Sequence, residues 1–134
     1  MDITTDRPRD DVAVVALTGE LDASNFEQVI DTARRLTADG AHHLILDLSG
    51  LSFMGSSGLV AIHSIALLMR GQEPPSPEHG WQAIHDVGAA DDAESGLLLA
   101  GAPPSIERVL DRSGMLGLFP VHPDRSSAVT AAAG

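Results

Sequence analysis

The sequence predicts an α/β protein, because segments with strand character alternate with segments of helical periodicity. Residues 12–17 are rich in β-branched side chains, which favours a strand. Residues 44–48 form a nearly continuous apolar run, which is typical of a strand in a largely parallel sheet with at least one face covered. A chain of 134 residues can bury one hydrophobic core, so we expect a single domain over residues 1–134.

Before these two strands and between them, the sequence predicts an edge strand, a turn and a helix. Residues 3–5 are predicted to form a short edge strand, and residues 6–10 a polar turn that contains a proline. The helix is expected to begin with a capping box, in which Ser24 and Glu27 each accept a hydrogen bond from a backbone N–H. Gly40 is the expected helix stop. Helical spacing predicts a buried face made of Phe26, Val29, Ile30, Ala33 and Leu36.

A turn of small residues follows the central strand and leads into a second helix. The turn covers residues 54–58, and the helical run covers residues 59–70. Where the turn leads into the helix, the hydroxyls of Ser56 and Ser57 are expected at the first helical turn. The first turn of a helix has unpaired N–H groups and a partial positive charge, which together stabilise a phosphate. A serine there can act as a reversible charge switch. From the local sequence alone, however, a plain helix cap is the favoured role of Ser56.

The helix over residues 59–70 is apolar on almost every side. The stripe expected to pack on the sheet consists of Leu59, Ala61, Ile62, Ile65, Ala66, Leu68 and Met69. The opposite stripe consists of Val60, His63, Ser64 and Leu67. If this second stripe is exposed, it is an apolar patch of the kind that often marks a partner surface. The equally weighted alternative is that the segment after the helix folds back and covers it.

Residues 71–95 differ in character from the rest of the chain. Three prolines between residues 74 and 77 disfavour a helix or a central strand, and residues 91–95 are acidic. We therefore predict a mobile loop outside the core. Two placements of its tryptophan, Trp81, stay open: anchored on the body of the protein, or exposed.

The last part of the chain is expected to add two strands and two helices. Residues 96–100 and residues 119–121 are predicted strands, and residues 103–114 contain a short helix between them. A small terminal helix is expected to be capped by Ser126 or Ser127. The inward face of the helix between the strands is predicted to consist of Ile106, Val109 and Leu110.

Composition argues against several classes of function. The formal charge of −11 disfavours binding to nucleic acid, and no apolar run is long enough to cross a bilayer. Without cysteine there is no disulfide framework and no thiolate metal site. The six histidines lack ligand spacing, and the adjacent His42 and His43 would point to opposite faces of a strand, so we expect no metal and no other cofactor. The N-terminus lacks the pattern of a signal peptide, so we expect a cytoplasmic protein.

Three segments of the chain share a pattern with a known family. Residues 17–22 read Leu-Thr-Gly-Glu-Leu-Asp, residues 46–49 read Leu-Asp-Leu-Ser, and residues 53–59 read Phe-Met-Gly-Ser-Ser-Gly-Leu. In these segments the chain resembles the STAS family, and within it the anti-sigma-factor antagonists, whose third segment typically reads Phe-Met-Asp-Ser-Ser-Gly-Leu. The resemblance continues over residues 97–121, so only residues 71–95 stand apart, as an insertion.

The resemblance implies a small mixed β-sheet with helices mainly on one face, and a protein-binding module that regulates transcription by partner switching. Unmodified, it would bind an anti-sigma factor with serine kinase activity; phosphorylation of Ser56, or alternatively Ser57, would release that partner. A serine phosphatase is a further implied partner. Together with the second stripe of the helix, the resemblance places the partner-binding surface at Asp22, Gly55, Ser56, Ser57, Gly58, Val60, His63, Ser64 and Leu67.

One departure from the family pattern is Gly55, which stands where the family has an acidic residue before the serine pair. Losing this carboxylate affects kinase recognition or the geometry of the turn. We expect aspartate to be tolerated at this position, because it can cap the following helix.

Two alternatives stay open beside the phosphorylation switch: a non-switching STAS scaffold subunit of a lipid-transport or stress-signalling assembly, and, more remotely, a small serine hydrolase. Neither Ser56 nor Ser57 has the Gly-x-Ser-x-Gly spacing of a nucleophile elbow. His63 lies about two helical turns from Ser56, too far to act as its base. In the implied fold, Asp22 and Asp47 are expected at strand ends near the serine turn, with capping or loop hydrogen bonds as their favoured roles.

Overall fold

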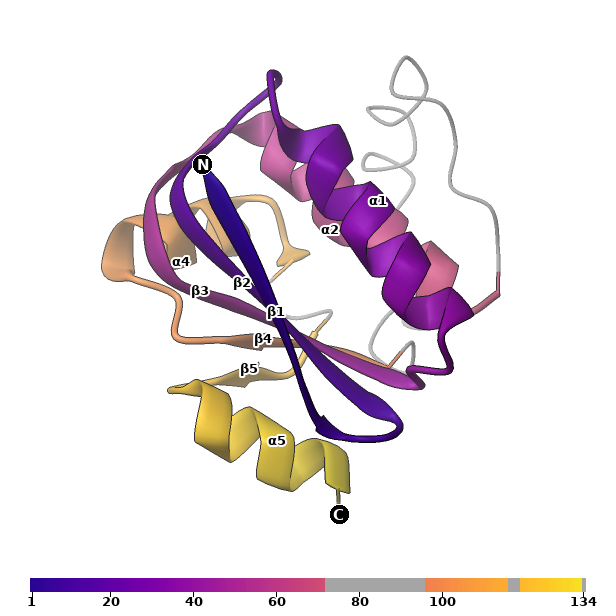
Figure 1. Cartoon of the computed structure of the whole chain (residues 1–134). Helices are drawn as coiled ribbons and strands as arrows, with labels where there is room; N and C mark the ends of the chain where they lie inside the picture. Colours follow the sequence, from indigo (N-terminus) through magenta and orange to yellow (C-terminus); the bar gives the residue numbers. More distant parts are fainter. Residues whose placement is uncertain (72–95, 116–118, 134) are drawn as a thin grey trace.

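The computed structural model describes residues 1–71, 96–115 and 119–133. Its centre is a mixed five-stranded sheet in the order β1-β2-β3-β4-β5 (Figure 1). β1 (Asp2–Arg9) pairs antiparallel with β2 (Val12–Leu21). Parallel pairing then joins β2, β3 (His43–Met54), β4 (Leu97–Ala100) and β5 (Val121–His122). The predicted α/β class with a small, largely parallel mixed sheet is confirmed.

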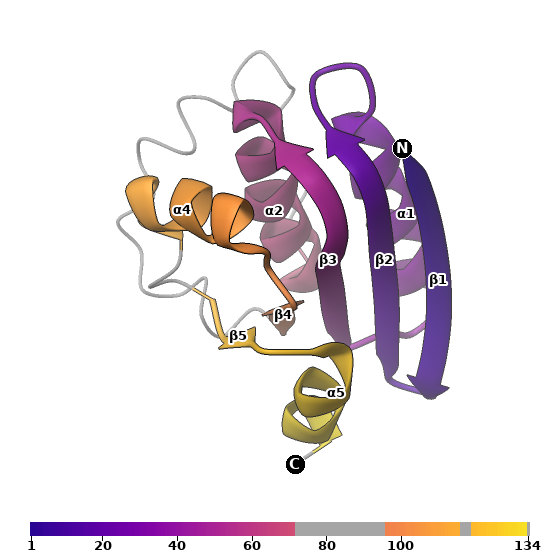
Figure 2. The same cartoon turned by 90° about the vertical axis from the view of Figure 1, so that its left-hand side faces the viewer.

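Helices cover the two faces of the sheet unequally (Figures 1 and 2). α1 (Phe26–Ala38), α2 (Ser56–Met69) and α4 (Pro104–Arg112) contribute buried side chains to the larger hydrophobic core on one face. α5 (Arg125–Ala133) packs on the opposite face, where Ala128 joins a smaller cluster. The sheet residues of that smaller cluster are Val12, Val14, Ile45, Leu98 and Ala100. The expected arrangement, with helices mainly on one face, is confirmed.

The N-terminal strand is longer than predicted. β1 continues through residues 6–9, which were expected to form a turn, and the turn itself lies at residues 10–11. The pairing of β1 with β2 shifts register between Asp6 and Arg9, around Pro8. Because β1 is an edge strand, a proline without an N–H is tolerated there. At the other end of the chain, the predicted strand at residues 119–121 is observed as Val121–His122.

The predicted helix caps are wrong in two places. α1 begins one residue later than the capping box requires, with Asn25 at the N-cap and no side-chain cap hydrogen bond. Ser24 instead donates its hydroxyl to Asp22 Oδ1, at 2.5 Å. In α5, the Ser127 backbone N–H donates to Asp124 Oδ1 at 2.8 Å, so Asp124 fills the role expected of a serine. The predicted stop at Gly40 is confirmed, since this residue follows α1 with φ of 105°.

β3 contains two irregularities that determine which of its side chains face the core. Asp47 pairs with Ala16 but Gly50 with Thr18, and one extra residue again separates Leu51 from Phe53 opposite Gly19 and Glu20. An extra residue in a strand reverses the face on which the following side chains lie. The buried side chains of the larger core are accordingly spaced by two and then by three residues: Leu44, Leu46, Leu48, Leu51 and Met54. The strand therefore extends to Met54, well beyond the predicted end at Leu48.

The predicted insertion at about 71–95, including Trp81, lies outside the described residues except for Gly71. Its expected mobility stays a prediction. The helix predicted after it is confirmed in α4, where Ile106 and Leu110 are buried and Val109 is half-buried.

Candidate functional site

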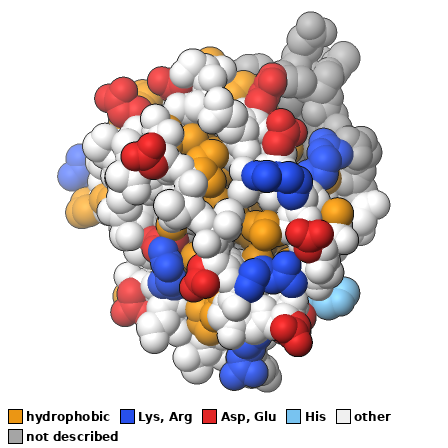
Figure 3. Space-filling model, viewed as in Figure 1, with side chains coloured by type: hydrophobic (Ala, Val, Ile, Leu, Met, Phe, Trp, Pro, Cys, Tyr) orange, Lys and Arg blue, Asp and Glu red, His pale blue; other side chains and the backbone are white. Residues whose placement is uncertain are grey.

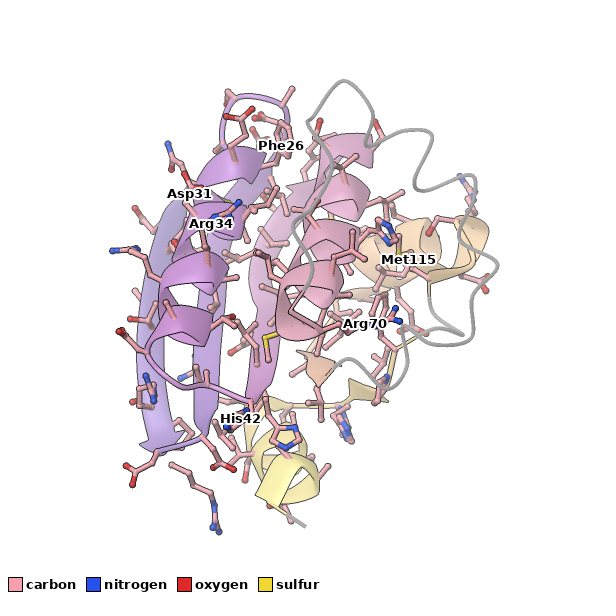
Figure 4. All side chains as sticks on the ribbon, turned by 90° about the vertical axis from the view of Figure 1, so that its right-hand side faces the viewer. Phe26, Asp31, Arg34, His42, Arg70 and Met115 are labelled. Atoms are coloured by element: carbon pink, nitrogen blue, oxygen red, sulfur yellow. The ribbon has the colours of Figure 1, made fainter. Side chains whose placement is uncertain are left out.

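The start of α2 lies beside the loop that follows β2. Gly55 is the N-cap of α2, and its backbone N–H donates to the carbonyl oxygen of Leu21 at 2.9 Å. The Gly55 carbonyl oxygen accepts a hydrogen bond from the Gly58 N–H, also at 2.9 Å. These bonds place Ser56 and Asp22 at the same end of the molecule. Figure 4 shows Phe26, the first residue of α1, at this end and His42 at the opposite end.

The two serines of the turn differ in accessibility. Ser56 is the first residue of α2 and is exposed, whereas Ser57 is half-buried. No side chain caps this helix end, since glycine occupies the N-cap. The exposed hydroxyl of Ser56 therefore lies where backbone N–H groups and the helix dipole favour a negative charge.

The loop after β2 is held by its own side chains. Asp22 Oδ1 accepts hydrogen bonds from the Ser24 hydroxyl, at 2.5 Å, and from its backbone N–H, at 2.9 Å. These two bonds, the hydroxyl bond first, lower the pKa of Asp22 below its usual value. Asn25 accepts a bond from the Asp22 N–H at 3.0 Å and donates to the Glu20 carbonyl oxygen at 2.8 Å. The loop therefore presents an ionised Asp22 in a fixed conformation next to the serine turn.

The two glycines of the turn differ in whether the structure requires them. A Cβ on Gly58 would lie 2.3 Å from Met54 Cγ and 3.1 Å from Leu21 Cδ2, so packing inside the turn requires glycine. Gly55 has φ of −82° and ψ of −178°, an extended conformation open to any residue. A Cβ on Gly55 would lie 3.4 Å from Cε2 of Phe53, at the limit of ordinary contact. Gly58 is thus a structural glycine, and the backbone does not require glycine at residue 55.

The second stripe of α2 is buried, so of the two alternatives left open for it the exposed patch is wrong. Val60, His63 and Ser64 are only 4%, 8% and 2% exposed, and Leu67 is half-buried. α2 lies between α1 and α4 (Figure 4), and Val60 belongs to the larger core cluster. Side chains buried in this way are not available to a partner in this conformation. Of the nine predicted partner-binding residues, only Asp22, Gly55, Ser56 and Ser57 are both accessible and gathered around the turn.

Comparison with known proteins identifies the family. The sequence model of the STAS domain matches residues 5–72, just over half of the chain, including the turn and α2. The chain belongs to the STAS family. The resemblance of residues 17–22, 46–49 and 53–59 to this family is thereby confirmed.

Individual relatives are similar over nearly the whole chain. A curated protein of Paenibacillus polymyxa, "Anti-sigma F factor antagonist", is 28% identical over 120 residues, which cover 89% of this chain and 85% of that protein. A crystal structure of an anti-sigma factor antagonist from Mycobacterium paratuberculosis is 25% identical, with a TM-score of 0.68 over 99% of this chain and 96% of the other. The structure of SpoIIAA in its unphosphorylated form also has a TM-score of 0.68, at 20% identity over 99% of this chain and 97% of that one.

Asp47 of this STAS protein does not lie near the serine turn, contrary to expectation. β3 continues for seven residues beyond Asp47, a span of about 23 Å. Its Oδ1 accepts from the Ser49 N–H at 3.0 Å and from the Ser49 hydroxyl at 2.7 Å. Its Oδ2 accepts from Nε of Arg125 in α5 at 3.1 Å. Burial raises the pKa of Asp47, but the hydrogen bonds from Ser49 and Arg125 outweigh it, so the pKa lies below its usual value.

The charges of the STAS protein are unevenly distributed. The strand ends and helix starts around the turn, residues 17–30 and 50–62, contain no arginine or lysine. They carry acidic residues at that end instead, among them Glu20, Asp22 and Glu27. By contrast, Figure 3 shows basic and acidic side chains interspersed over β1 and α1. The strand ends and helix starts at the turn therefore contribute carboxylates and no arginine or lysine, while the N-terminal ammonium group of Met1 adds a positive charge that acts on Asp22.

Across residues 1–71, 96–115 and 119–133, no three His, Cys, Asp or Glu side chains come close enough to hold a metal ion. Within the same ranges, no helix has the length and apolar character needed to cross a membrane.

Proposed function

We propose that this chain is an anti-sigma-factor antagonist, a non-enzymatic binding module that acts in the cytoplasm without a cofactor. Its partner is an anti-sigma factor with serine kinase activity, and phosphorylation of Ser56 switches the affinity. The observation that carries the proposal is the exposed Ser56 at the uncapped start of α2, beside the ordered Asp22 loop. The similarity to a Paenibacillus polymyxa protein named as an anti-sigma F factor antagonist supports it.

The proposed switch is a local change of charge. A phosphoserine adds about one and a half to two negative charges at neutral pH. In the free protein this charge rests on the N-terminus of α2, which stabilises it. In a complex the same phosphate must be desolvated, and each loss of about 1.4 kcal/mol weakens binding tenfold. No refolding of the domain is required for release.

The proposed contact surface is smaller than the one expected from the sequence. It consists of the accessible residues Asp22, Gly55, Ser56 and Ser57, while Gly58 and the buried residues of α2 support it from inside. A serine phosphatase that removes the phosphate from Ser56 completes the cycle.

Phosphorylation with purified components tests the proposal. The anti-sigma factors encoded in the same genome are purified and incubated one by one with the chain and ATP, and the product is mapped by phosphopeptide mass spectrometry. We expect one of them to modify Ser56, and we expect Ser56→Ala to abolish the modification. The matched control, Ser57→Ala, retains it, because Ser57 is half-buried one residue further into the helix. Modification confined to Ser57 or to another residue would refute the assignment of Ser56.

The kinase panel tests the scaffold alternative, and an ester screen run in parallel tests the hydrolase alternative. A non-switching STAS scaffold would bind a partner but remain unmodified by every kinase of the panel. A serine hydrolase would cleave model esters in a parallel screen, and Ser56→Ala would abolish that cleavage.

A further inference from the structure

Phe53 is the one large hydrophobic side chain that the described residues leave exposed, with 49% of its surface accessible. It is the penultimate residue of β3, two residues before the N-cap of α2. Aromatic side chains bury a large apolar area and are enriched at the centres of protein interfaces. An exposed aromatic ring at this place therefore needs a physical explanation.

The outward position of Phe53 follows from the second irregularity of β3. Leu51 faces the larger core, and strict alternation would turn Phe53 to the same side. The extra residue between Leu51 and Phe53 reverses this alternation, so Met54 is buried and Phe53 is exposed. The backbone of the strand, rather than a lack of space in the core, thus places the ring outside.

The ring adjoins the proposed contact surface. A Cβ on Gly55 would lie 3.4 Å from Cε2 and 3.7 Å from Cζ of Phe53, so the ring lies alongside the N-cap residue. Because residue 55 has no side chain, nothing from that position covers the ring. Glu20 pairs with Phe53 across the sheet, and Asp22 follows in the adjoining loop. The elements that adjoin the ring therefore contribute the carboxylates of Glu20 and Asp22 and no arginine or lysine, and the N-terminal ammonium group near Gly19 is the positive charge at this end that belongs to none of their side chains.

We propose that Phe53 is an aromatic anchor for the anti-sigma factor, which offers an apolar pocket rimmed by arginine or lysine side chains. The inference rests on the proposed function and deepens it, since it adds a contact that is independent of the phosphate. The pocket buries the ring, and its basic rim matches Glu20 and Asp22. The contact supplies affinity in the unmodified state, while Ser56 alone carries the switch.

Binding measurements with the purified anti-sigma factor that modifies Ser56 test this anchor. Wild type, Phe53→Ala and Phe53→Leu are titrated against it by biolayer interferometry. We expect Phe53→Ala to raise Kd about tenfold or more, and Phe53→Leu to raise it less, because leucine keeps part of the apolar area. In the phosphorylation assay, Phe53→Ala raises KM by a similar factor and leaves kcat nearly unchanged. Arg108→Ala, on the exposed surface of α4, is the control and retains the wild-type Kd.

A thermal melt accompanies each variant, and Phe53→Thr, which deletes the ring but keeps a residue of high strand propensity, replaces Phe53→Ala if the latter unfolds early. A Kd within twofold of wild type for both ring-deleted variants would overturn the anchor while leaving the proposed function intact. Failure of the wild-type chain to bind any anti-sigma factor would overturn both. Self-association of the chain that Phe53→Ala abolishes would also overturn it, because a second copy would then occupy the ring.

Discussion

Residue 55 shows how one position can depart from a family pattern without a change in backbone geometry. The resemblance to anti-sigma-factor antagonists places an acidic residue here, and this chain has glycine. Gly55 nevertheless adopts an extended conformation, with φ of −82°, and a Cβ would make only ordinary contact with the Phe53 ring. The backbone conformation therefore does not require glycine at residue 55, whereas packing requires it at residue 58.

Gly55→Asp is expected to preserve or raise thermal stability. The new carboxylate can accept a backbone N–H at the start of α2 and interact with the positive helix end, a gain of up to about 1 kcal/mol. We expect phosphorylation of Ser56 to be at least as fast as in the parent protein. A thermal melt and a phosphorylation time course measure both effects, with Gly55→Ala as the control that adds a Cβ without a cap. A lower melting temperature together with slower phosphorylation would show that the turn is specialised for glycine.

Side-chain competition at single residues limited what could be predicted around the turn. The spacing of Ser24 and Glu27 fits a capping box, but Asp22 lies two residues before Ser24 and accepts its hydroxyl instead. Asn25 links Glu20 and Asp22 through hydrogen bonds of its side chain. Nothing in the surrounding sequence distinguishes it from any other asparagine in a loop. Such local choices between donors and acceptors depend on backbone angles that the sequence does not specify.

At the level of elements, the period of the apolar pattern explains both the successes and the errors. α1 has one apolar face and was predicted correctly, with Phe26, Val29, Ile30 and Ala33 buried. α2 is apolar all round, which is typical of a helix buried on several sides. Periodicity alone could not decide whether its second stripe was covered. In β3 the spacing of the buried apolar residues changes from two to three after Leu48. The alternating pattern therefore ends at Leu48, although the strand itself continues through its register shifts to Met54.

An ion pair joins α5 to β3, and the sequence did not reveal it because Asp47 and Arg125 are 78 positions apart. Apolar contact with the smaller cluster is made by Ala128, which is buried, and by Val129 and Ala132, which are partly buried. The Arg125 guanidinium is 3.0 Å from Asp47 Oδ2 and is itself 42% exposed, which weakens the pair through solvent screening. We expect Arg125→Ala to lower the free energy of unfolding by about 1 kcal/mol at neutral pH. Urea denaturation measures this loss, with the exposed Arg112→Ala as the control.

The contribution of this ion pair also depends on pH. Because the pKa of Asp47 is lower in the folded protein than its ordinary value of 3.8, its stabilising effect is complete well above pH 3.8. It is lost as the pH falls below 3.8 and through the lowered folded pKa. We therefore expect the stability difference between wild type and Arg125→Ala to be constant near pH 7 and to shrink below about pH 4. A difference that grew on acidification would contradict this assignment.

Across the whole molecule, the fold brings the switch residue, the ordered acidic loop and the aromatic ring to one end of the sheet. The strand ends and the first turns of α1 and α2 that build this end carry no basic residue. A basic partner would be steered to this end by long-range attraction, which falls with added salt. A phosphate on Ser56 adds negative charge, so it does not repel a basic partner at long range. It weakens binding at close contact, where it must be desolvated.

The proposed switch is tested most sharply by the affinity of one protein before and after modification. The chain is phosphorylated to completion at Ser56, verified by intact mass, and titrated beside the unmodified chain against the anti-sigma factor that modifies it. We expect phosphorylation to raise Kd at least about tenfold, equivalent to roughly 1.4 kcal/mol, while the circular dichroism spectrum stays the same. Equal affinities of the two forms, in a protein fully modified at Ser56, would show that this serine does not switch the complex.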